Sequence, residues 1–272
     1  MLILAATPIG NLSDASPRLR ELLAESKFIA AEDTRSLLQL ANALGIQMQA
    51  KLFSLHEHNE LHRNSALVEL ALDDDLVLVS DAGMPTVSDP GFVLVRSVAA
   101  AGGTVTVVPG PSAVISALAV SGLPTDRFTF EGFLPRKSGE RQNVFAELLQ
   151  ERRTMIFFES PHRLLDALID AVAVFGPDRL AAVSRELTKK FEETKRGSLA
   201  ELADWARTEP KGEMVLIIGG AEEKTVNLDQ LIEQVNQLVA SGNRLKEAVI
   251  EIADANDFSK KLLYDAVLSA RK

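Results

Sequence analysis

The sequence contains no cysteine. A disulfide framework, a zinc site with thiolate ligands and a thiol nucleophile are therefore excluded. No apolar run approaches the about 18 residues that a membrane-spanning helix needs. The N-terminal stretch MLILAATPIG is apolar, but it has no basic segment before it and no clear cleavage site, which favours a first β-strand over a signal peptide. We expect a soluble protein of the cytoplasm without a membrane partner.

Tryptophan and tyrosine are nearly absent, with one residue of each against twelve phenylalanines. Little aromatic surface is left for stacking single-stranded RNA, which counts against a non-catalytic RNA-binding module. The net charge of −9 argues against indiscriminate nucleic-acid binding, because such binding depends on neutralising phosphates. Basic residues still cluster in two segments, 136–141 and 185–196. These clusters are either solvated surface charge or a face that binds an anion.

Short apolar runs such as LILAA and LVLVS alternate with helical patterns over most of the chain. This alternation predicts an α/β fold with parallel strands. The length of 272 residues and a change of character near residue 120 predict two α/β domains, residues 1–120 and 121–222. The pattern from residue 226 onward is helical with short loops, so we expect a small helix-turn-helix-like tail over 226–272.

Three loops follow apolar runs and are rich in glycine, proline and small residues: TPIGNLSD (7–14), SDAGMPTVSDPG (80–91) and PGPSA (109–113). In open α/β sheets, ligands bind beyond the carboxyl ends of the strands, where such loops lie. None of the loops has the pattern G-x-G-x-x-G or a P-loop, and prolines remove N–H donors that would bind a pyrophosphate. The composition favours a ligand with little negative charge, for example a nucleoside that carries a sulfonium.

Candidate acid–base groups stand in AEDTR (31–35) and RELTKKFEE (185–193). Glu32 is a candidate proton acceptor, Asp33 beside it is a further catalytic candidate, and Arg35 is a candidate ligand for a phosphate. The alternative for this segment is a helix start with Asp33 as its cap. Lys189 is a second candidate base, because a neighbouring positive charge favours a neutral lysine. The sequence does not choose between Glu32 and Lys189.

Three of the four histidines lie in SLHEHNELHRN (54–64), but their spacing does not match the metalloprotease pattern H-E-x-x-H. We expect no metal site and interpret His56 and Asn59 as substrate contacts, with exposed helix surface as the alternative. Arg163 in ESPHR and Arg185 are further candidate substrate contacts. The alternative for both arginines is a salt-bridged surface between domains.

The motifs TPIGNLSDASPRLRELL, AAEDTR, SLHEHNE, SDAGMPTVSDPG, PGPSA, GFLPRK, ESPHR and KGEMVLIIGG together resemble the small-subunit rRNA (cytidine-2′-O)-methyltransferase I family. That family lies within the tetrapyrrole-methylase superfamily. The resemblance implies two α/β domains with S-adenosylmethionine bound in a folded conformation in the cleft between them. It also implies a homodimer that methylates the ribose of a cytidine in the decoding region of 16S rRNA, with the assembled small subunit as the expected substrate.

The resemblance further implies which residues contact the cofactor. The first loop contributes Pro8. The loop at 80–91 contributes a run of neighbouring positions, and later segments complete the site. The full set expected from these segments is Asp81, Ala82, Gly83, Met84, Val87, Ser112, Ala113, Glu159 and Glu213.

Other functions are compatible with parts of the sequence. A related enzyme could methylate a tetrapyrrole or another small acceptor with the same cofactor site. An unrelated reading is a magnesium-dependent phosphohydrolase, because pairs of acidic residues suit Mg²⁺. Its carboxylates would be Glu32, Asp33, Asp73, Asp74, Asp75, Asp81 and Asp89.

Overall fold

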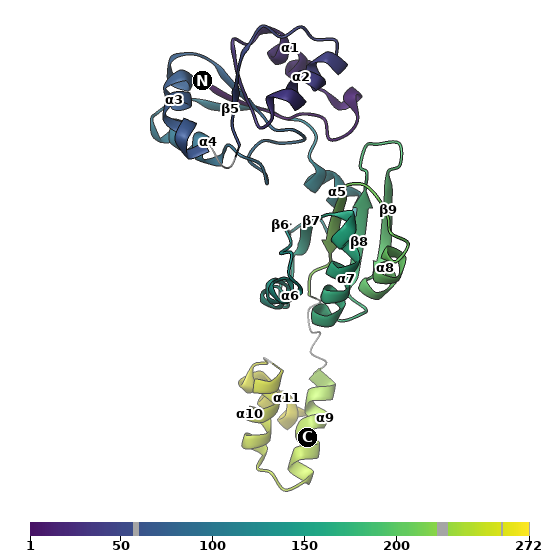
Figure 1. Ribbon diagram of the computed structural model, residues 1–272. Coiled ribbons are helices and arrows are strands. Elements are labelled where there is room, and N and C mark those ends of the chain that lie inside the picture. Colours follow the sequence, from purple (N-terminus) through teal and green to yellow (C-terminus); the bar gives the residue numbers. More distant parts are fainter. Residues whose placement is uncertain (57–59, 222–227, 257, 272) are drawn as a thin grey trace. The chain divides into compact units, whose positions relative to one another are not determined.

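The computed structural model describes residues 1–56, 60–221, 228–256 and 258–271. Two compact units make up the chain, one of residues 1–221 and one of residues 222–272. The first unit contains two β-sheets, and the second is helical (Figure 1). This arrangement confirms the predicted α/β class with a helical C-terminal segment.

The first sheet is parallel throughout and has the strand order β3-β2-β4-β1-β5. The central strands β1 and β4 read LILA and LVLV, and all their residues are buried. Such continuous apolar runs are typical of strands covered on both faces. The five strands are β1 (Leu2–Ala5), β2 (Phe28–Ala31), β3 (Lys51–Ser54), β4 (Leu76–Val79) and β5 (Val105–Val108).

Helices cover both faces of this sheet. Leucines of α1 and α2 pack in one core cluster, whereas α3 and α4 supply the opposite cluster (Figure 1). Neighbouring strands β1 and β4 are therefore followed by helices on opposite faces, and this opens a crevice at their carboxyl ends. The helices are η1 (Leu12–Asp14), α1 (Pro17–Glu25), α2 (Thr34–Ala43), α3 (Glu60–Asp73) and α4 (Phe92–Ala100).

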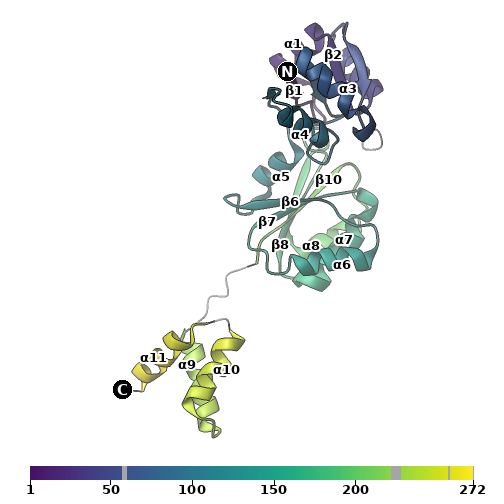
Figure 2. The ribbon, with the colours of Figure 1, turned by 90° about the vertical axis from the view of Figure 1, so that its left-hand side faces the viewer.

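The second sheet is mixed, with the order β6-β7-β10-β8-β9. Strand β6 runs parallel to β7, and the other neighbours are antiparallel. Three helices pack on one face around a core that includes Phe145 and Phe157 (Figure 2). The strands are β6 (Phe128–Phe133), β7 (Thr154–Glu159), β8 (Leu180–Arg185), β9 (Glu193–Ser198) and β10 (Met214–Ile218). The three helices are α6 (Ser138–Glu147), α7 (Pro161–Phe175) and α8 (Leu199–Ala206).

The other face of the second sheet is covered by α5 (Ala113–Ser121), which follows the last strand of the first sheet. Ile9, from the loop after β1, joins the same apolar cluster. The two sheets are thus connected by packing as well as by the chain. The predicted boundary near residue 120 falls at the end of α5, and it stays a prediction.

The C-terminal unit has a core of its own, made by residues such as Leu231, Val249 and Leu263. Its helices are α9 (Leu228–Ala240), α10 (Leu245–Ala255) and α11 (Lys260–Ala270). Across all described residues, no helix is long and apolar enough to cross a membrane.

Candidate active site

The loops after β1 and β4 are joined by a short antiparallel pairing. The Thr7 N–H donates to the Gly83 carbonyl at 2.9 Å, and the Gly83 N–H donates to the Thr7 carbonyl at 3.1 Å. The buried Thr7 hydroxyl also donates to the Ser80 carbonyl at 3.3 Å. Two loops that leave neighbouring strands are therefore held as one wall at the crevice.

The loop at 80–91 has an unusual backbone. Gly83 and Gly91 have φ of +83° and +120°, and Thr86 and Ser88 have φ of +74° and +61°. For residues other than glycine this region costs roughly 1–2 kcal/mol each, so the surrounding structure must enforce it. Glu60 fixes the far end of the loop, because its carboxylate accepts from the Gly91 and Val93 N–H groups at 3.0 Å each. Strain that is held in this way is typical of ligand sites.

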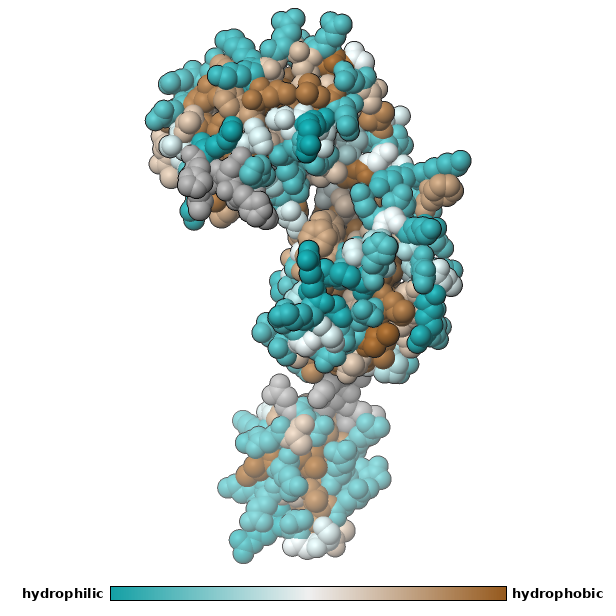
Figure 3. All heavy atoms as spheres, in the orientation of Figure 1, coloured by the Kyte–Doolittle hydropathy of each residue, from teal (hydrophilic) through white to brown (hydrophobic). Residues whose placement is uncertain are grey.

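A cavity of about 390 Å³ lies where the parts carrying the two sheets meet, and Figure 3 shows the molecule hollowed there. Eight of the predicted cofactor-binding residues line it, while Pro8 and Asp81 are not among the lining residues. The eight are Ala82, Gly83, Met84, Val87, Ser112, Ala113, Glu159 and Glu213. The structure thus brings together loops that are far apart in the sequence.

Several lining residues were not among the predicted cofactor-binding residues, although Asp89 was named as a carboxylate of the phosphohydrolase alternative. Phe133 and Phe158 stand at the ends of β6 and β7, and Asp89 is the second aspartate of the loop at 80–91. A polar residue in a loop already assigned to the site was a usable signal for Asp89. The aromatic pair had no such signal, because its position depends on how the second sheet packs.

The cavity is acidic. Asp89, Glu159 and Glu213 line it, and none of its lining residues is lysine, arginine or histidine. Burial and the negative charge of Glu32 raise the pKa of Asp89 to about 6. The Glu159 carboxylate is buried and pairs with the Arg163 Nη2 at 2.9 Å. Such a lining favours a cation and disfavours an anion.

Lys189 connects the second sheet to the first loop. Its Nζ lies 3.1 Å from Glu186 Oε1 and 2.9 Å from Glu213 Oε2, and its stem covers Gly10, where a Cβ would lie 2.5 Å from Lys189 Cγ. Burial acts to lower the pKa of Lys189, but the two carboxylates outweigh burial and raise it. This direction is opposite to the one that a general base requires, and a role of Lys189 as the base stays a prediction.

The AEDTR segment braces the start of the loop at 80–91. Asp33 caps α2 and binds Arg35 through two side-chain nitrogens, and the hydrogen bonds from Arg35 lower the pKa of Asp33 to about 2. The Asp81 carboxylate accepts from the Asp33 N–H at 3.3 Å, and the Asp81 N–H donates to Glu32 at 3.4 Å. The capping alternative for Asp33 is thus what the structure shows.

The residues predicted to contact the substrate lie in different surroundings: two arginines are in ion pairs, and the other two residues belong to the segment after β3. Arg185 pairs with Glu193 at 2.7 Å, and Arg163 is held between Glu159 and the Leu134 carbonyl. Both ion pairs lie within the second predicted domain and not between domains, and a substrate role for these arginines stays a prediction. His56 lies just after β3, and Asn59 lies outside the described residues.

The acidic residues of the phosphohydrolase reading are not gathered in one place. Asp74 pairs with Lys27 and Asp75 with the N-terminal amine, both at the amino end of β4. Asp81 and Asp89 lie beyond the carboxyl end of the same strand. Among the residues that the structure describes, no group of three or more acidic or histidine side chains could hold a metal ion.

Comparison with known proteins decides the class of the site. A model of the tetrapyrrole (corrin/porphyrin) methylases matches residues 1–203. The chain belongs to this family. The related crystal structure of the methyltransferase CobJ has a TM-score of 0.60 at 20% identity, covering 81% of this chain and 94% of that one. Diphthine synthase has a TM-score of 0.58 at 15% identity. At these identities the two structures support the fold alone.

Relatives of higher identity narrow the family. A protein of Mycobacterium tuberculosis (strain CDC 1551 / Oshkosh) is 49% identical over 273 residues, covering 100% of this chain and 95% of its own length. One of Escherichia coli O157:H7 is 43% identical, covering 98% and 94%. Both carry the name ribosomal RNA small subunit methyltransferase I. The predicted membership of the methyltransferase I family is confirmed, and S-adenosylmethionine is the cofactor.

The cavity residues fit this cofactor. Met84, Val87 and Met214 offer apolar walls for an adenosyl group, and the three carboxylates suit hydroxyl, ammonium and sulfonium groups. Gly83 lies close to Ile9 of the paired loop, since a Cβ at Gly83 would lie 3.4 Å from Ile9 Cγ2.

Gly83→Ala tests whether the paired loops form the cofactor wall. Gly102 is a matched control, because it has a similar φ of +77° and no atom within 4 Å of an added Cβ. We expect both alanine variants to lose about 1–2 kcal/mol of unfolding free energy through the left-handed backbone. Only Gly83→Ala should weaken S-adenosylmethionine binding, by about tenfold, because relief of its strained backbone shifts the cavity lining, to which Gly83 belongs and Gly102 does not. Equal affinities in calorimetry for the two variants would contradict the assignment.

Proposed function

We propose that the protein methylates the ribose 2′-hydroxyl of a cytidine in the decoding region of 16S rRNA. The substrate is the assembled small ribosomal subunit, and the reaction takes place in the cytoplasm. The observation that carries the proposal is the agreement, over the full chain, with relatives named for small-subunit ribosomal RNA. The acidic cavity at the carboxyl ends of β1 and β4 supplies a site for the donor.

The chemistry needs alignment above all. S-adenosylmethionine supplies a methyl group on a sulfonium, which a hydroxyl oxygen attacks in line. Alignment of reacting groups is worth about 7–11 kcal/mol of a barrier. The joined loops of Thr7 and Gly83 and the apolar side chains of Met84 and Phe158 hold the site in shape and exclude water from it.

We assign the removal of the hydroxyl proton to Asp89, in the loop that follows β4. Asp89 lines the cavity, and its pKa of about 6 is closer to neutral than that of an ordinary aspartate. A base near the working pH contributes about 10²- to 10⁴-fold to such reactions. In this proposal Asp89 accepts the hydroxyl proton, and Glu32 acts by raising the pKa of Asp89. Lys189 stays protonated and holds Glu213 at the cavity.

Two further parts of the proposal, an RNA contact at Arg35 and a homodimer, are compatible with this site. The remaining donors of Arg35, whose side chain is 85% exposed, are available to a phosphate of the RNA. A homodimer would cover apolar residues of β5 and α5 that are exposed in the single chain, namely Val107, Ile115 and Val120.

The direct test is methyl transfer to small subunits from a strain that lacks the modification. With labelled S-adenosylmethionine, we expect label in one cytidine of the decoding region, on the ribose oxygen. Subunits that already carry the mark are the control and should accept no label. Label on a base, label in a tetrapyrrole only, or no transfer to any rRNA would contradict the proposal.

A pH series tests the role of Asp89. Because the acceptor must be ionised and its pKa is raised to about 6, the rate should fall as the pH falls through about 6. Asp89→Asn should lose about 10²- to 10⁴-fold in rate and this limb of the profile. Asp33→Asn is the control, since the pKa of Asp33 is about 2 and its titration lies outside this window. A limb near pH 6 that persists in Asp89→Asn would show that another group is the base.

A further inference from the structure

Phe133 is directed into the cavity by an irregularity of β6. The register between β6 and β7 shifts between Phe130 and Phe133, and Gly132 between them has φ of +71°. A bulge of this kind bends a strand and turns the following side chain, and bulges are frequent beside active sites. The Phe133 ring packs edge-on against Phe158 at 5.4 Å, and Phe158 packs in the same way against Phe130 at 4.9 Å.

The ring of Phe133 is supported from one side and open on the other. Its side chain is 63% exposed although it lines the cavity. An aromatic ring that is fixed by a neighbour and open to solvent offers a face on which a base can stack, and stacking accepts any base.

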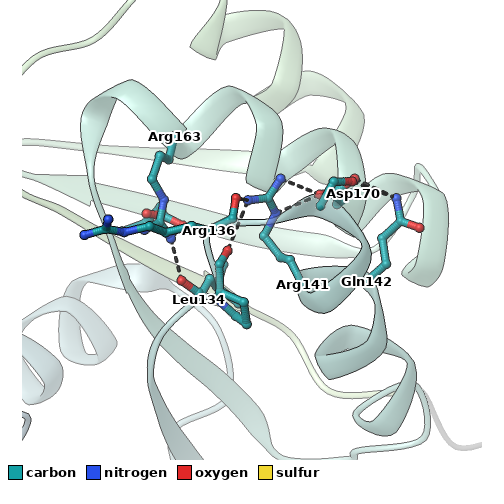
Figure 4. A network of polar contacts seen from close by, with 9 residues as sticks. Leu134, Arg136, Arg141, Gln142, Arg163 and Asp170 are labelled. Carbon is teal, nitrogen blue, oxygen red and sulfur yellow. Dashed lines mark hydrogen bonds and ion pairs between the residues drawn. The ribbon is translucent and has the colours of Figure 1, made fainter.

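The loop after Phe133 is held from inside the protein by two arginines. The Arg163 guanidinium donates to the Leu134 carbonyl, and Arg141 donates to the carbonyls of Pro135 and Arg136 (Figure 4). Arg141 is buried and pairs with Asp170 at 2.7 Å, so it is not part of a basic surface. A buried ion pair adds little net stability. Together, the contacts from Arg141 and Arg163 fix three successive carbonyl groups and hence the course of this loop.

Arg136 is the cation that this loop presents to solvent. In Figure 4 its side chain extends away from the Arg141–Asp170 pair, and it makes no ion pair with any residue that the structure describes. Its neighbour Lys137 is paired with Glu140 at 2.9 Å. The cavity itself carries carboxylates and no basic side chain, so an anion is repelled from it and attracted to Arg136, which follows the lining residue Phe133 by three positions.

We infer that Phe133 and Arg136 form a subsite for the acceptor nucleotide, in which a base stacks on the open face of Phe133 and Arg136 binds an adjacent phosphate. The fixed loop between them sets their separation. This inference rests on the proposed function, because it assigns the RNA side of the same reaction.

The experiment compares the full-length protein with Phe133→Ala, Phe133→Trp and Arg136→Ala. Leu180→Ala is the apolar control, because Leu180 is 59% exposed at the opposite end of the second sheet. Arg207→Ala is the charge control, since Arg207, just after α8, pairs with Asp204 on the surface. The measurements are the Kd of S-adenosylmethionine by calorimetry and the KM of unmodified small subunits at several salt concentrations.

We expect Phe133→Ala to raise the KM of the subunit about tenfold or more, and Phe133→Trp to restore it. Arg136→Ala should raise the same KM and lower the slope of log affinity against log salt by about 0.7–0.9, which is the loss of one phosphate contact. In all three variants and both controls the Kd of S-adenosylmethionine should stay within about twofold of the wild type, since the cofactor site is unchanged.

Two results would overturn the subsite. A weaker Kd for S-adenosylmethionine in Phe133→Ala with an unchanged KM for the subunit would assign this ring to the cofactor. An unchanged salt slope in Arg136→Ala would remove the phosphate contact. If the wild type methylates the subunit and the variants match their controls, the subsite is wrong and the function stands. If the wild type transfers no methyl group to the subunit, the proposed function itself is wrong.

Discussion

The two hydrogen bonds between Thr7 and Gly83 are the constraint on which the site depends. They join the loops of two neighbouring strands whose helices lie on opposite faces of the sheet, so the crevice between the strands receives a rigid wall. Ile9, two residues after Thr7 in the first loop, packs against the second sheet. Gly10 beside it lies under Lys189. One short loop therefore shapes the cavity and sets the position of the second sheet over it.

This rigidity has a cost and a benefit. Thr86 and Ser88 take left-handed backbone conformations, and ordinary side chains adopt these only where neighbours enforce them. A site that is formed before the ligand arrives loses less conformational entropy on binding and keeps the reacting groups aligned. The charges on the protein also favour different places for the methyl donor and for the acceptor. The cavity is acidic and suits a cationic donor, whereas the exposed Arg136, three residues after Phe133, suits the phosphates of an RNA acceptor.

The sequence allowed the fold class and most of the loop residues that line the cavity to be predicted, for physical reasons. Apolar runs such as LVLV mark buried parallel strands, and a loop with two glycines and two prolines after such a run marks a ligand edge. The sequence did not show which charged residues pair with one another. The pKa of Lys189 is set by Glu186 and Glu213, and Arg141 is removed from the surface by Asp170, which lies 29 residues away. Phe133 was missed because a strand irregularity, rather than its residue type, directs it to the site.

The central claim is that the wall made by the loops at 7–9 and 80–91 exists before the cofactor binds. Hydrogen–deuterium exchange of the cofactor-free protein tests it most directly, at the amides of Thr7 and Gly83. The account predicts that both amides exchange slowly without S-adenosylmethionine and change little when it is added. Fast exchange at both amides in the free protein, with protection only after the cofactor is added, would contradict the account.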